Sequence, residues 1–424
     1  MTAPKGGLLL ALALLGCGLV AAASQWTAVL VQPASWSETD YQLHWAAGRA
    51  LALGLDPYDA AAVEPIGVTT GRPMTPFCAA TPLFVAGFAW LGERPFADGY
   101  HLLLGVNVVL LCLSVALLAA ALRRAGAPAA AALGASLALV LLDDGTWMAL
   151  WFNQLNFVTL AAMTGALWAG CSGRPRAEGV LLAVAAWAKL SPVLVIVFAA
   201  LAGRWRTVRA ALAAGAALLA LSVAVAGWEA HASWLAMVQR ELGFAAERPA
   251  GLFNNSLHAW NLAPNGVLSR AAQVAGWPRG VVLLGAALAA LAAVGTAAFS
   301  LRRGTTRPEE PRTVFAVHAL GVSAGFLASS TTWVPHLSLA AVPLAFVVLA
   351  AWKAPGRALL VRAAGAAAAV LLFLPLGTFD ASDDQRVDVL AKLDGCILLL
   401  VAVVAATRMP PPRAEDGGLE ARGG

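Results

Sequence analysis

A carboxylate and an imidazole stand one helical turn apart in the stretch SETDYQLHWAAGR. Asp40 and His44 are four residues apart, so on a helix they share one face. A carboxylate beside an imidazole can take the proton of an attacking hydroxyl group. Ser37 stands three residues before Asp40, which matches the capping box at a helix start. The spacing therefore predicts either a general base or a helix cap.

Further polar and aromatic residues interrupt the apolar parts of the chain and could bind a substrate. They are Asn153, Gln154 and Asn156; Lys189; Asn254, Asn255, Ser256 and His258; and Trp333 with His336. Amides and hydroxyls suit sugar hydroxyls or a phosphate, and a cation in an apolar segment is costly unless it pairs or functions. Structural roles remain open: a helix cap, a lysine that reaches the interface, a solvated loop and an interfacial tryptophan.

The elements that must position these residues are membrane helices. The 424-residue chain is 60% hydrophobic and only 12% charged, with a mean hydropathy of +0.75, whereas a soluble domain carries about 25% charged residues. Apolar runs long enough to cross a bilayer recur along it. We therefore predict an all-α polytopic membrane protein with about 10–13 membrane segments.

The positive charge of the chain points to membrane topology rather than to nucleic acid. The formal net charge is +5, and the arginines lie in short loops such as Arg123-Arg124 and Arg302-Arg303. Such loops face the cytoplasm and anionic lipid. The five cysteines are scattered singly, without the spacing of a metal site. No nucleic-acid partner is expected, and membrane lipids are.

The apolar segments number twelve, near residues 7–24, 76–92, 100–122, 127–142, 154–171, 180–201, 208–227, 280–300, 313–328, 337–352, 358–375 and 392–407. If all twelve cross, the arginines at 123, 124, 174 and 176 lie outside, against the positive-inside rule. Prolines in segment 76–92 and the Lys189-Leu190-Ser191-Pro192 run in segment 180–201 favour broken or re-entrant forms, which move these arginines inside. We favour this second arrangement.

Two long loops are expected outside the cytoplasm, at residues 25–75 and 228–279. The first contains a predicted helix at 38–53, ended by Gly54, and the second a predicted amphipathic helix at 230–247. Segment 7–24 also resembles a cleaved signal peptide, and either alternative leaves residues 25–75 outside. Residues 1–407 are expected to form one membrane domain, followed by a disordered cytoplasmic tail at 408–424.

The sequence lacks the motifs of soluble nucleotide chemistry. It has no phosphate-binding P-loop, no GxGxxG and no HExxH, and Asp143-Asp144 is the nearest approach to a DxD pair. A membrane enzyme of this kind, without a cytoplasmic domain, would need a lipid-linked substrate.

Six motifs in order resemble glycosyltransferase family 87, membrane enzymes of the GT-C type that use polyprenyl-phosphate mannose. They are TDYQLHWAAGRALALGLDPYD, TPFCAATPLFVAGFAWLGERPF, FNQLNFVTL, AWAKLSPVLVIVFAALAGRWR, FNNSLHAW and TTWVPHLSLAAVP. By this resemblance Asp40 is the acidic residue of the first outer loop and the candidate base, and Tyr58 belongs to the G-x-x-PYD turn. Asn153 or Gln154 with Asn156 matches G-Q-x-N, and Lys189 with Pro192 matches K-x-x-P.

The remaining matches are less regular. Asn254, Asn255 and Ser256 match N-Q-S with one substitution, and His336 matches the second position after Trp333, where Pro335 replaces the first histidine. The departures at Asn153 and Pro335 leave the identity of donor or acceptor open.

The resemblance implies transfer of mannose from a polyprenyl-phosphate donor to a lipid- or glycan-linked acceptor. The transfer would occur with inversion, without a cofactor or metal, at the outer face of a bacterial-type plasma membrane. Asp40 would be the base, and the other residues named above, His44 included, would bind substrate. The alternatives are a secondary transporter or lipid flippase, a GT-C enzyme for arabinofuranose or glucose, and a non-catalytic subunit.

Overall fold

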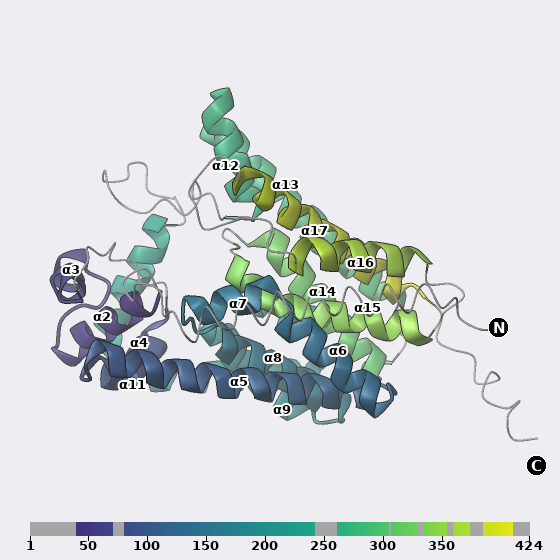
Figure 1. Cartoon of the computed structure of the whole chain (residues 1–424), viewed down its shortest axis with the longest axis horizontal. Coiled ribbons are helices and arrows are strands. Elements are labelled where there is room, and N and C mark those ends of the chain that lie inside the picture. The colour runs from purple at the N-terminus through teal and green to yellow at the C-terminus, as the bar shows by residue number, and fades with distance from the viewer. Residues whose placement is uncertain are drawn as a thin grey trace, which may run out of the picture.

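The computed structural model describes residues 40–70, 80–241, 261–304, 307–329, 332, 334–353, 359–373 and 385–409, and all regular structure within them is helical (Figure 1). The first apolar segment, 7–24, and the tail from residue 410 lie outside these ranges. The helices are α2 (Asp40–Ala52), α3 (Ala60–Val68), α4 (Pro82–Gly92), α5 (Phe96–Arg124), α6 (Ala129–Leu141), α7 (Asp144–Trp151), α8 (Asn156–Cys171), α9 (Pro175–Ala188), α10 (Val193–Leu201), α11 (Trp205–Glu241), α12 (Pro264–Ala275), α13 (Arg279–Gly304), α14 (Pro311–Ala328), the 3₁₀ helix η2 (Val334–Ala340), α15 (Ala341–Lys353), α16 (Leu359–Phe373) and α17 (Gln385–Thr407).

The helix lengths confirm an all-α membrane protein. Four of the described helices, α5, α11, α13 and α17, are long and apolar enough to cross a bilayer, and α6 with α7 makes a fifth candidate bent by 54°. Shorter apolar helices of 10–17 residues include α4, α8 and α16. The expected membrane segments therefore include several that are shorter than a full single-helix crossing.

Of the two segments expected to be broken, the one at 180–201 is broken in the structure, and the described part of the one at 76–92 forms only a short helix. α4 has only 11 residues, about 16 Å of helix, which is half a bilayer core. The segment at 180–201 divides into α9 and α10, with Lys189 in extended backbone between them. Arg204, just after α10, pairs with Glu178 near the start of α9. α9 and α10 therefore form a helical hairpin that returns to the end where it began, with Lys189 at its tip.

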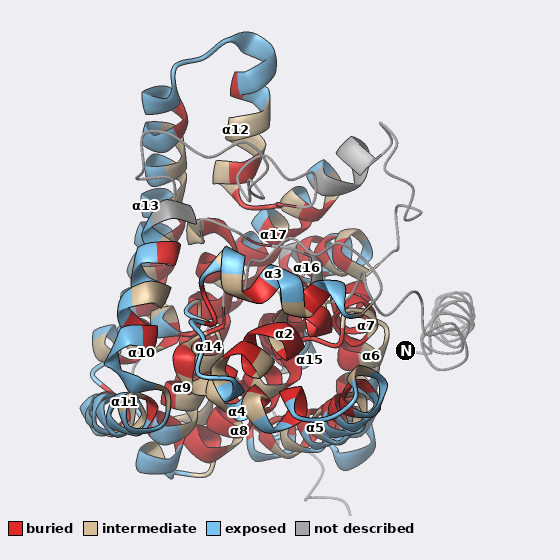
Figure 2. Cartoon of the chain, turned by 90° about the vertical axis from the view of Figure 1, so that its left-hand side faces the viewer, coloured by how far each residue is buried: buried red, intermediate tan, exposed pale blue. Residues whose placement is uncertain are grey.

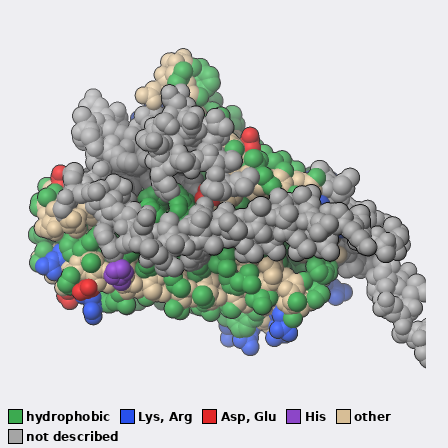
Figure 3. All heavy atoms as spheres, in the orientation of Figure 1, with side chains coloured by type: hydrophobic (Ala, Val, Ile, Leu, Met, Phe, Trp, Pro, Cys, Tyr) green, Lys and Arg blue, Asp and Glu red, His purple; other side chains and the backbone are tan. Residues whose placement is uncertain are grey.

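The arginine-rich turns gather at one end of the bundle. The Cys171 thiol at the end of α8 lies 3.9 Å from the Pro311 carbonyl at the start of α14. Arg312 donates to Ala406 at the end of α17 over 3.2 Å, and the hydroxyls of Ser300 and Thr407 are 2.7 Å apart. Figure 3 shows Lys and Arg side chains along the lower right edge of the face drawn, and others at its left end. This grouping agrees with the broken form of the two segments.

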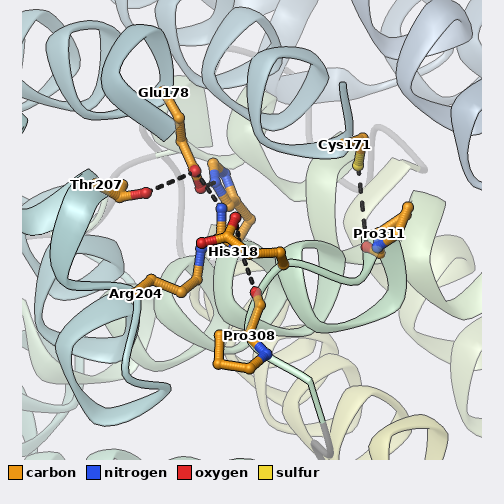
Figure 4. Close-up of polar contacts among 8 residues, drawn as sticks. Cys171, Glu178, Arg204, Thr207, Pro308, Pro311 and His318 are labelled. Atoms are coloured by element: carbon orange, nitrogen blue, oxygen red, sulfur yellow. Dashed lines mark hydrogen bonds and ion pairs between the residues drawn. The ribbon is translucent and has the colours of Figure 1, made fainter. Parts of the chain in front are cut away.

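A buried charge network closes this end (Figure 4). Glu178 of α9 accepts hydrogen bonds from Arg204, from the Thr207 hydroxyl at 2.9 Å and from the His318 imidazole of α14 at 3.1 Å. All four side chains are buried. The network ties the base of the α9–α10 hairpin to α11 and α14.

The opposite end is built from α2, α3 and α4, which lie together at the left of Figure 1. They share a second hydrophobic core that includes Tyr41, Trp45 and Phe88, and Figure 2 shows the inward face of α2 buried. α2 and α4 approach closely, since a Cβ added at Gly48 would lie 2.5 Å from the Phe88 carbonyl oxygen. The predicted helix 38–53 is confirmed as α2, and Gly54 ends it with a φ of 72°.

Three elements differ from the sequence-based expectation. α3 begins where the Asp59 side chain accepts from the backbone N–H of Ala61 at 3.1 Å, and α7 occupies an expected loop. α11 joins segment 208–227 to the predicted helix 230–247, with a kink at Gly227. Gly227 has φ 80° and ψ 160°, a conformation that only glycine adopts readily. Residues 242–247 lie outside the described ranges.

Candidate functional site

The turn between α7 and α8 has the hydrogen bonds of a Schellman motif. The Asn153 N–H donates to the Leu150 carbonyl at 2.9 Å, and the Gln154 N–H donates to the Ala149 carbonyl at 3.0 Å. Asn153 takes the left-handed position with φ 48°, the only non-glycine residue with positive φ in the described part of the chain. Asparagine tolerates this conformation. Asn153 therefore ends α7, instead of capping the start of α8 as its place before an apolar run suggested.

This turn delivers two hydrogen bonds to the first residues of α2. The Phe152 carbonyl accepts from the backbone N–H of Tyr41 at 3.3 Å. The Gln154 side-chain amide donates to the Asp40 carboxylate, and its oxygen accepts from the Asn156 amide at 2.7 Å. Asn156, Gln154 and Asp40 thus form one chain of hydrogen bonds across α8 and α2. Its direction requires Asp40 to accept, which favours the ionised carboxylate.

Asp40 is held in an environment that tunes its proton affinity. Burial raises the pKa of its carboxyl to about 6, while the Gln154 hydrogen bond and the positive charge of Lys189 lower it. Asp40 is therefore mostly ionised at neutral pH, yet more basic than an exposed aspartate, whose pKa is about 3.9. These are the properties of a general base near neutral pH.

His44 lies on the same face, as the four-residue spacing predicts, and is uncharged. Burial first, and then the charge of Lys189, lowers the pKa of the His44 imidazole to about 4. The His44 ring stacks on Phe88 of α4 with centroids 5.0 Å apart. His44 can therefore offer a hydrogen bond at neutral pH but no positive charge.

Lys189 is the cation of this site. Burial lowers the pKa of its ammonium group to about 7, against the charge of Asp40, which raises it, so the group is partly protonated at neutral pH. Lys189 lies at the tip of the α9–α10 hairpin, half-buried, and its charge acts on both Asp40 and His44. The Thr81 hydroxyl donates to the Trp187 carbonyl over 3.3 Å, which ties the hairpin tip to the start of α4. The structure thus brings Lys189, Asp40 and Gln154 together from distant parts of the sequence.

The other predicted site residues fall into two groups. The Tyr58 hydroxyl donates to the Ala80 carbonyl at 2.8 Å, which fixes the turn before α3 to the start of α4. His336 lies half-buried in η2, which packs against α7 and α8. The remaining residues, Asn254, Asn255, Ser256, His258 and Trp333, lie outside the described residues.

Two buried polar groups that contact α7 or the turn after it were not identified from the sequence. Asn107 of α5 donates to the Asn153 side chain at 2.8 Å. Lys392 of α17 donates to Asp144 at 3.0 Å and to the Leu372 carbonyl at 2.7 Å. Each is a single amide or ammonium group in an apolar segment. The same feature identified Lys189 as a candidate site residue.

The fold and the site together define an all-helical membrane protein with a carboxylate and a lysine at the end opposite its arginine-rich turns. Residues 79–330, more than half of the chain, match the sequence model of Glycosyltransferase family 87. The chain therefore belongs to glycosyltransferase family 87, a membrane family of the GT-C type. No curated protein matches the chain in sequence. The matched range includes Gln154 and Lys189 and begins after Asp40.

Proposed function

We propose that this glycosyltransferase moves mannose from polyprenyl-phosphate mannose to a lipid- or glycan-linked acceptor at the outer face of the membrane. The observation that carries the proposal is the Asp40 carboxylate, held by Gln154 and placed within the field of Lys189. A base for an attacking hydroxyl and a cation for a phosphate are the two groups that such a transfer needs.

In the proposed reaction Asp40 takes the proton of the acceptor hydroxyl. The hydroxyl oxygen attacks the anomeric carbon, and the bond from that carbon to the phosphate oxygen breaks, so polyprenyl phosphate leaves with the electron pair. Attack from the side opposite the leaving group inverts the carbon and turns a β-linked donor into an α-linked product. Gln154 occupies one side of the carboxylate, which leaves the other oxygen for the hydroxyl.

Lys189 is proposed to balance the negative charge that develops on the leaving phosphate. Its positive charge already acts on Asp40, where it lowers the pKa of the carboxyl. Gln154 and Asn156 would orient the base, and His44 would act as a neutral hydrogen-bonding group beside it. The Asn254–His258 run and the pair Trp333 and His336 stay proposed sugar- and phosphate-binding residues on the family resemblance alone.

The outward orientation of the site rests on charge. The arginine-rich turns lie at the end of the bundle opposite α2, and short basic loops face the cytoplasm. Membership of a glycosyltransferase family favours an enzyme over a secondary transporter or lipid flippase, which was the main alternative.

The test is a donor comparison with membranes of cells that express or lack the chain. Radiolabelled polyprenyl-phosphate mannose, glucose and arabinofuranose are supplied in turn, beside GDP-mannose as a nucleotide donor. The proposal predicts chain-dependent labelling from the lipid-linked mannose, in a product that α-mannosidase releases. Labelling from another lipid-linked sugar would overturn the sugar assignment, and direct labelling from GDP-mannose, with the lipid-linked pool blocked, would overturn the donor class.

A further inference from the structure

A buried asparagine inside α5 contacts the turn that carries Gln154. Asn107 is fully buried in a helix long enough to cross the membrane. Its side-chain nitrogen donates to the Asn153 side-chain oxygen at 2.8 Å, and the Asn153 nitrogen donates to the Tyr100 carbonyl at 3.0 Å. Both ends of the Asn153 side chain are therefore held by α5.

Packing alone does not explain an amide at position 107. The Asn107 side-chain oxygen is buried and has no hydrogen-bond partner among the residues that the structure describes, and burying a polar atom in that state is costly. An apolar residue of similar size would avoid that cost. The Asn107 amide instead donates a hydrogen bond to Asn153. Asn153 has the least common backbone conformation in the turn, with φ 48°.

The conformation of Asn153 decides where its neighbours point. Phe152 and Gln154, on either side of it, make the two hydrogen bonds to Tyr41 and Asp40 at the start of α2. A turn that relaxed at Asn153 would move the Gln154 amide away from the carboxylate. Asp40 would then lose the hydrogen bond that lowers its pKa.

We propose that Asn107 is a positioning residue for sugar transfer, which acts through Asn153 to aim Gln154 at Asp40. The inference rests on the proposed role of Asp40 as the base. Because Asn107 is fully buried and contacts Asn153 rather than Asp40, its loss should change the rate of the chemical step and the proton affinity of Asp40 rather than donor affinity.

The test compares Asn107→Val with Ser114→Ala. Ser114 is a matched control, because it is also buried in α5 and its hydroxyl donates within its own helix, to the Leu110 carbonyl at 2.7 Å. N107V should lower kcat about ten-fold, leave KM for the donor unchanged, and move the acid limb of the pH–rate profile to higher pH. S114A should leave all three as in the natural chain. An unchanged acid limb in N107V would overturn the proposal.

Asn153→Gly tests the same contact from the turn, because glycine accepts positive φ without strain but has no side chain for Asn107 to hold. N153G should reproduce the shifted acid limb even where N107V folds poorly. The double variant should be no slower than N153G, since N153G already removes the hydrogen bond that N107V removes, together with the one to the Tyr100 carbonyl. Losses of rate that add in the double variant would overturn the proposal.

Asp40→Asn distinguishes failure of the positioning role of Asn107 from failure of Asp40 as the base. If D40N abolishes transfer while N107V and N153G keep the natural acid limb, the positioning role fails and the base assignment stands. If D40N retains transfer, the base assignment fails, and the positioning role fails with it.

Discussion

Asp40 is the residue whose surroundings matter most for the chemistry. Burial raises its pKa, and two groups from connections between other helices, the Gln154 amide and the Lys189 ammonium, oppose that rise. The balance leaves a carboxylate that is ionised at neutral pH and holds a proton more tightly than an exposed aspartate. A general base works best with a pKa near the operating pH, so the opposing effects suit the proposed role.

Sugar transfer should fall as the pH is lowered through about 6, because protonated Asp40 cannot accept the hydroxyl proton. Gln154→Leu removes a hydrogen bond to the charged form, so the pKa of Asp40 should rise and the acid limb should move to higher pH. The measurement is kcat against pH from 4.5 to 8. Gln42→Leu is the control, since Gln42 is buried on α2 but donates to Gly67 and Thr70. An acid limb that Q154L leaves in place would contradict the assignment.

At the scale of elements, the site depends on close contacts between short helices. α2 can place Asp40 only because it packs on α4, and Gly48 allows that approach. The Schellman turn of α7 meets the start of α2 from the other side. Neither α2 nor α4 is long enough to be a membrane span by itself, so both are held in place by their neighbours.

Gly48→Val should therefore displace α2, and Asp40 with it, although the added side chain contacts α4 and not Asp40. The added side chain meets the Phe88 backbone, and such overpacking costs about 1–3 kcal/mol. We expect a lower unfolding temperature and reduced transfer. Gly87→Val is the control on the facing helix, because a Cβ at Gly87 meets nothing within 4 Å. Equal effects of G48V and G87V, measured by thermal unfolding in detergent, would show that the α2–α4 contact is not limiting.

Local sequence signals predicted some of these elements and missed others. Gly54 and the apolar residues of 38–53 were enough to place α2, and the Lys-Leu-Ser-Pro run was enough to predict the break between α9 and α10. α3 and α7 were missed because they have 9 and 8 residues, too short for a periodic pattern. The Asp40–Gln154 contact joins residues 114 positions apart, so only the folded chain brings them together. Asn107 carries a recognisable signal but no local clue to its partner.

At the scale of the whole molecule, the two ends have different chemistry. One end carries arginine-rich turns and the buried Glu178 network, and the other carries the site at α2. The α9–α10 hairpin connects them, with Glu178 near its base and Lys189 at its tip. The network therefore fixes the base of the hairpin whose tip carries the lysine that acts on Asp40.

Glu178→Gln should destabilise the protein strongly, because it leaves Arg204 buried without its buried carboxylate partner. Breaking a buried pair in this way costs about 3–5 kcal/mol. Glu309→Gln is the matched control: Glu309 pairs with the same arginine at 3.6 Å but is half exposed, so its loss should cost about 0–1 kcal/mol. Thermal unfolding of the two variants measures the difference, and similar melting temperatures would contradict the structural role given to Glu178.

The orientation of the two ends can be read by labelling. In a chain whose own cysteines are replaced, Asp59→Cys should react with a membrane-impermeant maleimide added outside intact cells. Arg124→Cys should react only after the cells are opened. Both positions are exposed, so access depends on the side of the membrane. Labelling of residue 124 from outside would contradict an outward-facing site at α2.

The most direct measurement of the central claim is sugar transfer from radiolabelled polyprenyl-phosphate mannose by Asp40→Asn. Asn keeps the size of Asp40 but cannot accept the proton, so transfer should fall at least about 100-fold while expression and unfolding temperature stay near those of the natural chain. Asp59→Asn, which changes an exposed acid in the turn before α3, should transfer normally. Transfer by D40N at the rate of D59N would contradict the role of Asp40 as the base.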